Sequence, residues 1–320
     1  MWIIRYFSLG RFAIREALSL IGVGAGDSVM LPSYICRDVL ASVHERGAKP
    51  IFYDVDANLQ PKFLDPETKS KAIIAVNYFG FPQNLEAFEK YARSCGAVIV
   101  EDNAHGLLSR DETGNLLGQR TDFGITCFRK TIRTPDGAIL MTSLAETQVS
   151  AQLDYVFRPK NARNIILSFF AAIQRFTNFP LLNWVQSGLK SVRRVVTGSV
   201  VPSIDATVER IIPGVPNPSR SSVRKFLRIN EAAEISRRRN LYNTIYPEII
   251  RLGIKPVFES LKDGTCPYGF PVFATPDSQS ELSNLARKYR VTLMSWPDLP
   301  FEVLPTAPDH YKQIWLLNFL

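Results

Sequence analysis

The stretch KAIIAVNYFGFPQNLEAFEKYARSCGAVIVED, residues 71–102, holds one complete strand–helix–strand repeat. Its first run, KAIIAVNYF, is continuously apolar between polar residues, which is typical of a strand buried on both faces. NLEAFEKYARSCG has apolar residues at helical spacing and ends at Gly96, and AVIVED is again a short apolar run. Two buried strands joined by a helix predict parallel neighbours connected by a right-handed crossover.

The same alternation of strand and helix periods extends over about the first 145 residues. We therefore predict an α/β fold with a mostly parallel central sheet flanked by helices. The expected strands are SVMLPSY (28–34), KPIFYDV (49–55), TDFGITCF (121–128) and GAILMT (137–142), and the further helices are RFAIREALSLI (11–21) and DVLASVHER (38–46). GVGAGD (22–27) follows a helix and precedes a strand, so we interpret it as a helix C-cap and turn, not as a phosphate loop.

The remainder of the chain changes character twice, and we predict three segments. Residues 1–150 form the large α/β domain, residues 151–221 a basic, apolar connecting segment, and residues 222–320 a small α+β domain. In the last segment we expect one long helix over 225–252, a strand at 267–274, a helix at 278–290 and a strand at 291–296.

Composition excludes several classes of protein. The chain has 320 residues, of which 46% are hydrophobic and 21% charged, as in a globular protein with ample core. Its 4 cysteines form no CxxC pair and its 3 histidines are isolated, so we expect neither a zinc ribbon, a disulfide framework nor a histidine-rich metal site. No secretory leader pattern and no uninterrupted apolar run of ~18 residues occurs. We expect a cytoplasmic protein.

The net charge of +8 is unevenly distributed. Seven Lys or Arg and no Asp or Glu occur between residues 155 and 204, so we expect no nucleic-acid footprint over the whole domain. Two interpretations of this segment stay open. It is either a buried helical pair that joins the domains, or a peripheral membrane contact in which aromatic side chains and flanking arginines lie in the lipid head-group plane.

In a parallel sheet, ligands bind at the carboxyl ends of the strands, and this rule selects candidate residues. Asp102 ends the strand AVIVED, where it either caps the following turn or holds a cationic partner. Lys130 follows the next apolar strand, and a desolvated lysine is a nucleophilic amine. Gly10 precedes a helix whose free N–H groups favour a phosphate.

These motifs together resemble a known family. The order of a glycine before a helix, PSY, VNYFGFP, EDNAH and a lysine followed by PDG is similar to that in DegT/StrS-type sugar-nucleotide aminotransferases, which are pyridoxal-phosphate (PLP) enzymes of fold type I. The resemblance runs from about Gly10 to Thr142 and is weaker from Arg220 to the end.

The resemblance implies roles for individual residues. Lys130 matches the lysine that forms a Schiff base with the cofactor and shuttles the proton, Asp102 the partner of the pyridine nitrogen, and His105 the residue that faces the phenolic oxygen. Cys127 lies where the family usually has a phosphate-binding serine, and Cys36 where it usually has a stacking aromatic ring, for which Tyr34 is a nearby substitute. The complete set of residues that the resemblance places at the cofactor is Gly10, Arg11, Tyr34, Cys36, Asp102, His105, Cys127 and Lys130.

The activity implied is transfer of an amino group, with glutamate as the expected donor, to a nucleotide-linked keto-sugar in surface polysaccharide synthesis by a homodimer. Sugar dehydration is disfavoured, since position 130 is lysine and the dehydratase relatives have histidine there. The alternative is a weakly active or inactive relative that serves as a binding or regulatory protein, which Cys36 and Cys127 favour and the retention of Lys130, Asp102 and His105 opposes.

Overall fold

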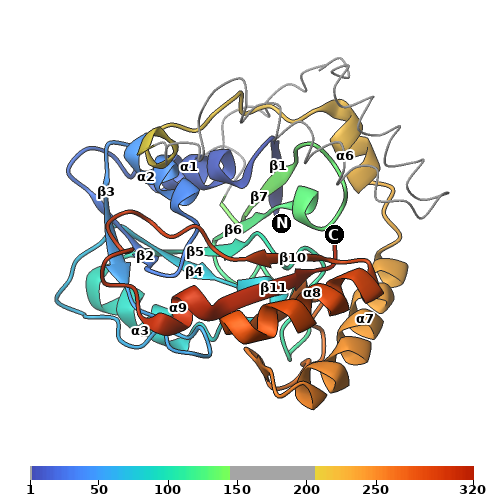
Figure 1. Ribbon diagram of the computed structural model, residues 1–320. Helices are drawn as coiled ribbons and strands as arrows, with labels where there is room; N and C mark the ends of the chain where they lie inside the picture. The colour runs from blue at the N-terminus through green and yellow to red at the C-terminus, as the bar shows by residue number, and fades with distance from the viewer. Residues whose placement is uncertain (1, 145–205) are drawn as a thin grey trace, which may run out of the picture. The chain divides into compact units, whose positions relative to one another are not determined.

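The computed structural model describes residues 2–144 and 206–320, and within these ranges the chain forms two β-sheets (Figure 1). The described residues up to 144 and from 207 onward belong to one compact unit. The first sheet has the strand order β1-β7-β6-β5-β4-β2-β3 and the second the order β10-β11-β9-β8. The strands of the first sheet are β1 (Ile3–Phe7), β2 (Ser28–Pro32), β3 (Lys49–Tyr53), β4 (Ala72–Val76), β5 (Val98–Asn103), β6 (Phe123–Thr126) and β7 (Ala138–Thr142).

The first sheet is mostly parallel, which confirms the predicted fold class. Strands β2 to β6 run parallel to their neighbours, whereas β7 is antiparallel to both β6 and β1. All five residues of the AIIAV run in β4 are buried, because β4 lies between β5 and β2 and both faces of the sheet are covered. Burying one Ile side chain such as Ile73 contributes about 1.5–3 kcal/mol, so these central runs hold much of the core. The edge strand β1 was not predicted.

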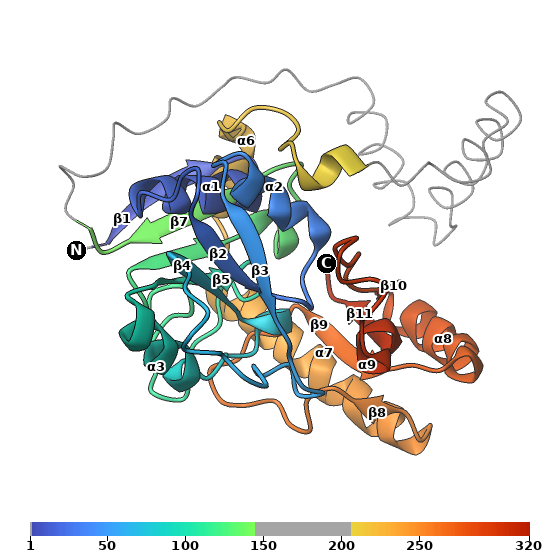
Figure 2. The same cartoon turned by 90° about the vertical axis from the view of Figure 1, so that its left-hand side faces the viewer.

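Helices cover the two faces of this sheet in the way that its strand order requires. The crossover β2–α2–β3 and the crossover β4–α3–β5 advance across the sheet in opposite directions. Right-handed crossovers that advance in opposite directions place their helices on opposite faces. Figure 2 shows α1 and α2 together on one side of the sheet and α3 on the other. The helical elements are α1 (Gly10–Leu20), η1 (Arg37–Val39), α2 (Leu40–His44), η2 (Tyr78–Gly80), α3 (Glu86–Cys95) and η3 (Phe128–Lys130).

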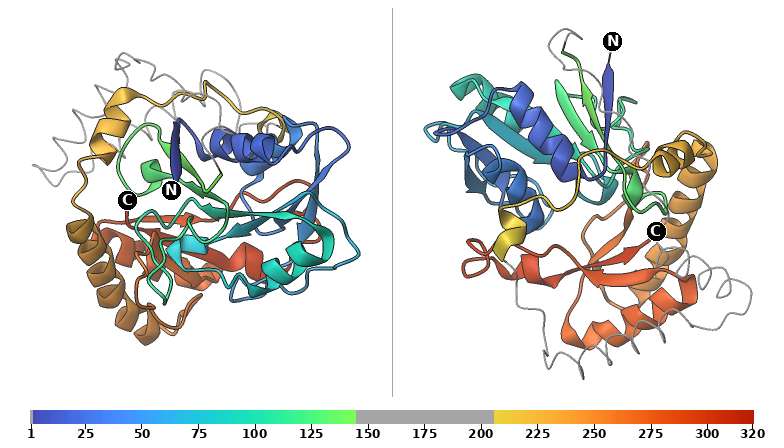
Figure 3. Two further views of the ribbon diagram at one scale, coloured as in Figure 1. Left: turned by 180° about the vertical axis from the view of Figure 1, so that it is seen from behind. Right: turned by 90° about the horizontal axis from the view of Figure 1, so that it is seen from above.

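The second sheet is antiparallel and is packed by α7 (Figure 3). The elements of this part are η5 (Ala206–Glu209), α6 (Arg220–Phe226), α7 (Glu231–Arg251), β8 (Lys255–Pro256), β9 (Gly269–Phe273), η6 (Pro276–Ser278), α8 (Gln279–Tyr289), β10 (Thr292–Ser295), α9 (Asp309–Gln313) and β11 (Ile314–Asn318). The predicted strands at 267–274 and 291–296 and the helix at 278–290 are confirmed as β9, β10 and α8. Strand β11, which pairs with both β9 and β10, was not predicted.

The single helix predicted over 225–252 is wrong. The chain instead ends α6 at Phe226 and starts α7 at Glu231, with Asn230 between them in an extended conformation. The Asn230 side chain accepts a hydrogen bond from the Ala233 N–H at 3.0 Å, which makes Asn230 an N-cap. The helical spacing of the apolar residues continues across this break, which explains why periodicity alone did not reveal it.

Most of the predicted basic connecting segment is not among the described residues. Residues 155–204, for which both a helical pair and a membrane contact were considered, lie outside the described residues, as does most of the predicted segment 151–221. The division into three segments, with boundaries after residues 150 and 221, therefore stays a prediction. Within the described ranges, no helix is both long and apolar enough to cross a bilayer.

Candidate active site

The carboxyl ends of the parallel strands bring the predicted residues to one edge of the first sheet. Asp102 is the fifth residue of β5, and it pairs in register with Val76 of β4 on one side and Ile125 of β6 on the other. Cys127 and Lys130 follow β6 directly, and Gly10 begins α1 three residues after β1 ends. The sheet topology thus gathers residues that are up to 120 positions apart in the sequence.

Asp102 is buried with few polar partners. Its side chain is 6% exposed, and within the described ranges its carboxylate accepts one hydrogen bond, from the Ala104 N–H at 2.9 Å. Burial raises the pKa of Asp102 above its ordinary value, and the positive charge of Lys130 opposes part of this shift. A buried carboxylate with one backbone partner and a nearby cation is able to accept a further hydrogen bond from a ligand.

His105 is held rigidly between aromatic rings. Its imidazole stacks on Tyr268 with centroids 4.6 Å apart and on Phe79 with centroids 5.7 Å apart, and the edge of Trp296 packs against it at 5.1 Å. Burial lowers the pKa of His105 well below its usual range, and the charges of Lys130 and Arg129 act in the same direction. The ring is therefore neutral at physiological pH.

The tautomer of His105 follows from its backbone contact. The Phe79 N–H donates to Nδ1 of His105 at 3.3 Å, and a neutral imidazole that accepts at Nδ1 carries its proton on Nε2. The Nε2–H donates to the Lys130 Nζ, 3.1 Å away, when the lysine amine is uncharged, because an ammonium group has no acceptor. Phe79 makes this contact from a left-handed backbone conformation with φ 55°, which is uncommon for an aromatic residue. The structure thus joins Lys130 directly to the histidine that the sequence placed three residues after Asp102.

The segment that carries Lys130 is fixed by close packing. Gly137 has φ 137°, and a Cβ built there would lie 1.9 Å from the Phe128 ring, so only glycine allows this approach. The Gly137 N–H donates to the Ser8 carbonyl at 2.7 Å, and the Arg129 N–H donates to the Gly137 carbonyl at 3.2 Å. These contacts tie the lysine segment to the chain that leads into α1.

Gly10 and Cys127 lie against each other. A Cβ at Gly10 would lie 2.5 Å from the Cys127 Sγ, and the N-cap residue Leu9 provides no side-chain hydrogen bond to the first turn of α1. Leu9 therefore does not supply the side-chain cap that a Ser, Thr, Asp or Asn would give, and the Gly10 N–H lies against the Cys127 thiol and lowers its pKa. Arg11, the second predicted phosphate ligand, pairs with Asp38 at 3.3 Å.

The two candidates for stacking on a ligand ring differ in their surroundings. Tyr34 is fully buried, its hydroxyl donates to the Trp296 carbonyl at 2.6 Å, and its ring packs against those of Tyr78, Trp296 and Tyr311. Cys36 is half-buried; burial raises the pKa of its thiol, and the charge of Lys130 partly opposes that shift. The structure thus brings Cys36 into the neighbourhood of Lys130 and places Tyr34 inside an aromatic cluster.

Sequence reasoning missed several residues of this cluster. Tyr268 and Trp296 reach His105 from the second sheet and from the chain after β10, and no local pattern reveals such contacts. Asp136, which belongs to the PDG motif noted in the sequence, accepts hydrogen bonds from the N–H and hydroxyl of Ser219 at 3.0 and 2.8 Å, and this contact with the N-cap of α6 was not predicted. Arg129 was readable from its position beside Lys130 but was not singled out.

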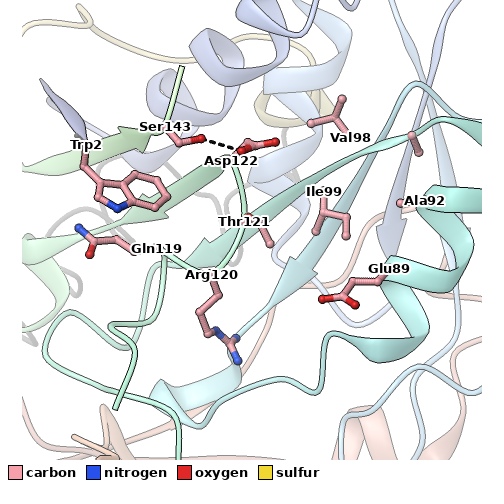
Figure 4. Close-up of a pocket in the computed structure, with 11 residues that line it drawn as sticks. Trp2, Glu89, Ala92, Val98, Ile99, Gln119, Arg120, Thr121, Asp122 and Ser143 are labelled. Carbon is pink, nitrogen blue, oxygen red and sulfur yellow. Dashed lines mark hydrogen bonds between the residues drawn. The ribbon is translucent and has the colours of Figure 1, made fainter. Parts of the chain in front are cut away.

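A hollow of about 470 Å³ lies at the opposite edge of the sheet (Figure 4). Its lining comes from α3, the start of β5 and the residues that flank β6 and β7, and it includes Arg120 and a hydrogen bond from Ser143 to Asp122 at 2.6 Å. None of the predicted site residues lines it. We assign the candidate site to the carboxyl edge, because the buried titratable groups gather there and ligands of parallel sheets bind there. No trio of His, Cys, Asp or Glu side chains arranged to hold a metal occurs in the described ranges.

Comparison with known proteins agrees with this geometry. Residues 7–155, which contain every predicted site residue, match the sequence profile of the DegT/DnrJ/EryC1/StrS aminotransferase family. Two curated relatives are the pleiotropic regulatory protein of Geobacillus stearothermophilus, 35% identical over 103 residues, and the GDP-perosamine synthase of Escherichia coli O157:H7, 31% identical over 143 residues.

The coverage of these matches limits what they show. The aligned segments span 31% and 42% of this chain but 28% and 39% of the two curated relatives, so the chain matches less than half of either protein. Solved structures extend the likeness in fold alone. The aminotransferase TlmJ from Streptoalloteichus hindustanus matches with a TM-score of 0.63 at 19% identity, over 98% of this chain and 80% of that one. Spr1654 from Streptococcus pneumoniae, in its PLP form, matches with a TM-score of 0.64 at 14% identity, over 98% of this chain and 81% of that one. The DegT/DnrJ/EryC1/StrS fold therefore extends beyond the matched segment.

Proposed function

We propose that this protein is a PLP-dependent aminotransferase that moves an amino group from an amino acid, with glutamate as the expected donor, to a nucleotide-linked keto-sugar. The observation that carries the proposal is the contact of 3.1 Å between Lys130 Nζ and His105 Nε2, beside a buried carboxylate whose pKa responds to the lysine charge. The match of residues 7–155 to the family's sequence profile and the similarity to a GDP-perosamine synthase support the reaction class.

The residues present fit this cofactor. The site offers a primary amine, a buried carboxylate with one described hydrogen bond, and a helix start without a side-chain cap. An aldehyde requires a nucleophilic amine, a protonated pyridine nitrogen requires a carboxylate that accepts its hydrogen bond, and a phosphate requires N–H donors. When bound, PLP supplies an electron-accepting ring attached through its aldehyde to a lysine amine.

Each residue has a distinct task in this proposal. Lys130 provides the amine that attaches the cofactor and moves a proton at its Nζ. The Asp102 carboxylate holds a proton on the pyridine nitrogen, and its burial strengthens that interaction because the local dielectric constant is low. His105, neutral and fixed by Phe79 and Tyr268, orients the lysine amine and presents its Nε2–H toward the phenolic oxygen position.

A spectrum with a linked assay tests the proposal. Purified protein reconstituted with PLP is expected to show a visible absorption band that is lost on addition of glutamate, with release of 2-oxoglutarate. Lys130→Ala is expected to abolish both the band and turnover, because no other group in the described cluster is a primary amine. The Lys62→Ala variant, altered at an exposed lysine, serves as the control and is expected to keep both.

A second candidate function is a binding or regulatory role without turnover. The similarity to a pleiotropic regulatory protein, together with Cys36 and Cys127 in the site, favours it. This candidate predicts that the wild type binds PLP but releases no keto acid from glutamate or from any other amino-acid donor. Release of 2-oxoglutarate at a rate dependent on Lys130 excludes it.

Three further parts of the proposal concern the assembly and its surroundings. We infer a homodimer, a place in surface polysaccharide synthesis in the cytoplasm, and a peripheral membrane contact through residues 155–204. Sedimentation at several protein concentrations tests the dimer, and a monomer at all concentrations contradicts it.

Flotation with anionic and neutral vesicles tests the membrane contact, and equal binding to both kinds of vesicle contradicts an electrostatic contact.

A further inference from the structure

Arg129 is a half-buried cation with no partner in the described residues. Its Nε is buried and makes no hydrogen bond, and no ion pair or side-chain hydrogen bond joins its guanidinium to another described residue. Two other buried arginines are fully paired, whereas Arg5, whose Nε also makes no hydrogen bond among the described residues, keeps an ion pair with Glu16. Arg238, 1% exposed, donates to Glu234 and to three backbone carbonyls, and Arg120 pairs with Glu101. A desolvated guanidinium donor without an acceptor is costly, so its retention calls for a ligand.

The position of Arg129 directs that charge toward the candidate site. It lies in η3 between Phe128 and Lys130, and its backbone is fixed by the hydrogen bond to Gly137. The positive charge of Arg129 lowers the pKa of His105, in the same direction as burial does. It also lowers the pKa of Cys127, which burial raises. The backbone hydrogen bonds from Arg129 to Gly137 and from Gly137 to Ser8, two residues before Gly10, tie Arg129 to the chain that leads into α1.

Because Cys127 replaces the expected serine, another side chain is needed to bind an anion here. The thiol lies against Gly10 at the start of α1, at the position where the family resemblance expects a serine hydroxyl. A thiol is a weak hydrogen-bond donor, and burial raises the pKa of this one, so Cys127 contributes little to binding an anion. Arg11 is engaged with Asp38. Arg129 and Lys130 are the two cationic side chains of η3, which directly follows Cys127, and the proposed function uses Lys130 for the aldehyde.

We propose that Arg129 binds the phosphate group of the cofactor and takes over the task of the missing serine hydroxyl. A guanidinium offers planar paired N–H donors that match phosphate oxygens, and charge-assisted bonds of this kind are about twice as strong as neutral ones. The assignment rests on the proposed function, because it takes PLP as the ligand. It adds a phosphate ligand that the resemblance did not supply.

Paired titrations with PLP and with pyridoxal, which lacks the phosphate, test the assignment. Dissociation constants are measured by absorbance for the wild-type protein and for Arg129→Gln, with circular dichroism to establish folding. We expect Arg129→Gln to weaken PLP binding by about 10- to 100-fold, since a hydrogen bond to a charged group contributes about 1.5–3 kcal/mol, and to change pyridoxal binding by less than about twofold.

Two further variants isolate the role of the guanidinium. Arg133→Gln removes the same charge from an exposed residue of the same loop, whose guanidinium donates to the Leu320 carbonyl, and it is expected to change neither constant. Cys127→Ser in the Arg129→Gln background restores a hydroxyl donor and is expected to recover part of the PLP affinity without affecting pyridoxal.

The outcomes separate the assignment from the proposed function. An equal loss of PLP and pyridoxal affinity in Arg129→Gln indicates a structural role and overturns the assignment. Unchanged PLP affinity with a raised KM for glutamate places Arg129 at the donor carboxylate and also overturns it. If the wild type binds neither ligand, the proposed function fails and the assignment fails with it.

Discussion

Two neighbouring carboxylates in β5, Glu101 and Asp102, have opposite surroundings although both are buried. Successive strand residues point to opposite faces of the sheet, so the two side chains enter different environments. Glu101, 0% exposed, accepts hydrogen bonds from Arg120 Nε at 2.8 Å, Arg120 N–H at 3.1 Å and Asn77 Nδ2 at 2.7 Å. Asp102 accepts one described hydrogen bond, and the positive charge of Lys130 offsets part of the rise in pKa that burial causes. The comparison teaches that a completed network marks structure, whereas an incomplete one marks a site prepared for a ligand.

The largest effect on activity is expected at the incomplete carboxylate. Asp102→Asn keeps an oxygen that accepts from the Ala104 N–H but removes the charge opposite the pyridine nitrogen, so kcat/KM is expected to fall about 10³-fold. Since burial raises the pKa of Asp102, its ionisation disfavours the folded state above the ordinary pKa of 3.8. The apoprotein of this variant is therefore expected to melt at the same or a higher temperature at neutral pH. A loss of stability equal to the loss of activity contradicts the contrast.

The largest effect on stability is expected at the completed carboxylate. Glu101→Gln leaves Arg120, whose side chain is 10% exposed, without its counter-charge, and removing one partner of a buried pair costs about 3–5 kcal/mol. Urea unfolding measures this change. Glu89→Gln, at an exposed pair with Arg93, is the matched control and is expected to cost less than about 0.5 kcal/mol. Similar costs at the two positions remove the basis for the comparison.

A smaller effect is expected where α1 begins. Gly10→Ala places a Cβ 2.5 Å from the Cys127 Sγ, and overpacking of this kind costs about 1–3 kcal/mol. The double variant Gly10→Ala with Cys127→Ala lacks the sulfur atom and is expected to recover most of the lost stability. Thermal unfolding of both apoproteins checks the prediction, and an additive loss in the double variant contradicts the contact.

The smallest effect is a pH dependence from His105. Its folded pKa lies below the ordinary value of 6.5, so the unfolded chain binds a proton that the folded protein does not bind, and stability falls as pH drops below about 6.5. We expect a loss of about 1 kcal/mol over the first pH unit below that value. His105→Asn keeps an acceptor near the Phe79 N–H and should remove this contribution, while His44 and His310 remain unchanged in both proteins. An identical pH profile in the variant indicates that His105 is not held neutral.

The sequence predicted the parallel strands of the first sheet and two of the candidate site residues for physical reasons. Runs such as AIIAV in β4 are buried on both faces, so they are apolar throughout and easily recognised. Asp102 and Lys130 follow from the rule that parallel strands collect ligands at their carboxyl ends. The rule does not distinguish Glu101 from Asp102, because which face each side chain enters depends on the register of the whole sheet.

The features that were missed depend on contacts between distant parts of the chain. Tyr268 reaches His105 because its N–H donates to the Phe79 carbonyl at 2.8 Å, a contact across 189 positions that leaves no local pattern. Asn230 ends a helical pattern through a single cap, which periodicity averages out. That the Arg129 Nε is buried without a partner in the described part of the chain depends on the three-dimensional positions of its neighbours, which no sequence pattern gives.

Borohydride reduction of the PLP-loaded protein, followed by peptide mass mapping, tests the central claim most directly. Reduction makes the cofactor–lysine linkage permanent, and the mass gain identifies the lysine that carries it. We expect the mass gain on the peptide that contains Lys130. We expect a smaller fraction of that peptide to carry the gain in Asp102→Asn loaded at the same PLP concentration. A gain on another lysine, or none in a wild-type protein that retains PLP, contradicts the assignment of Lys130 and Asp102 to one cofactor site.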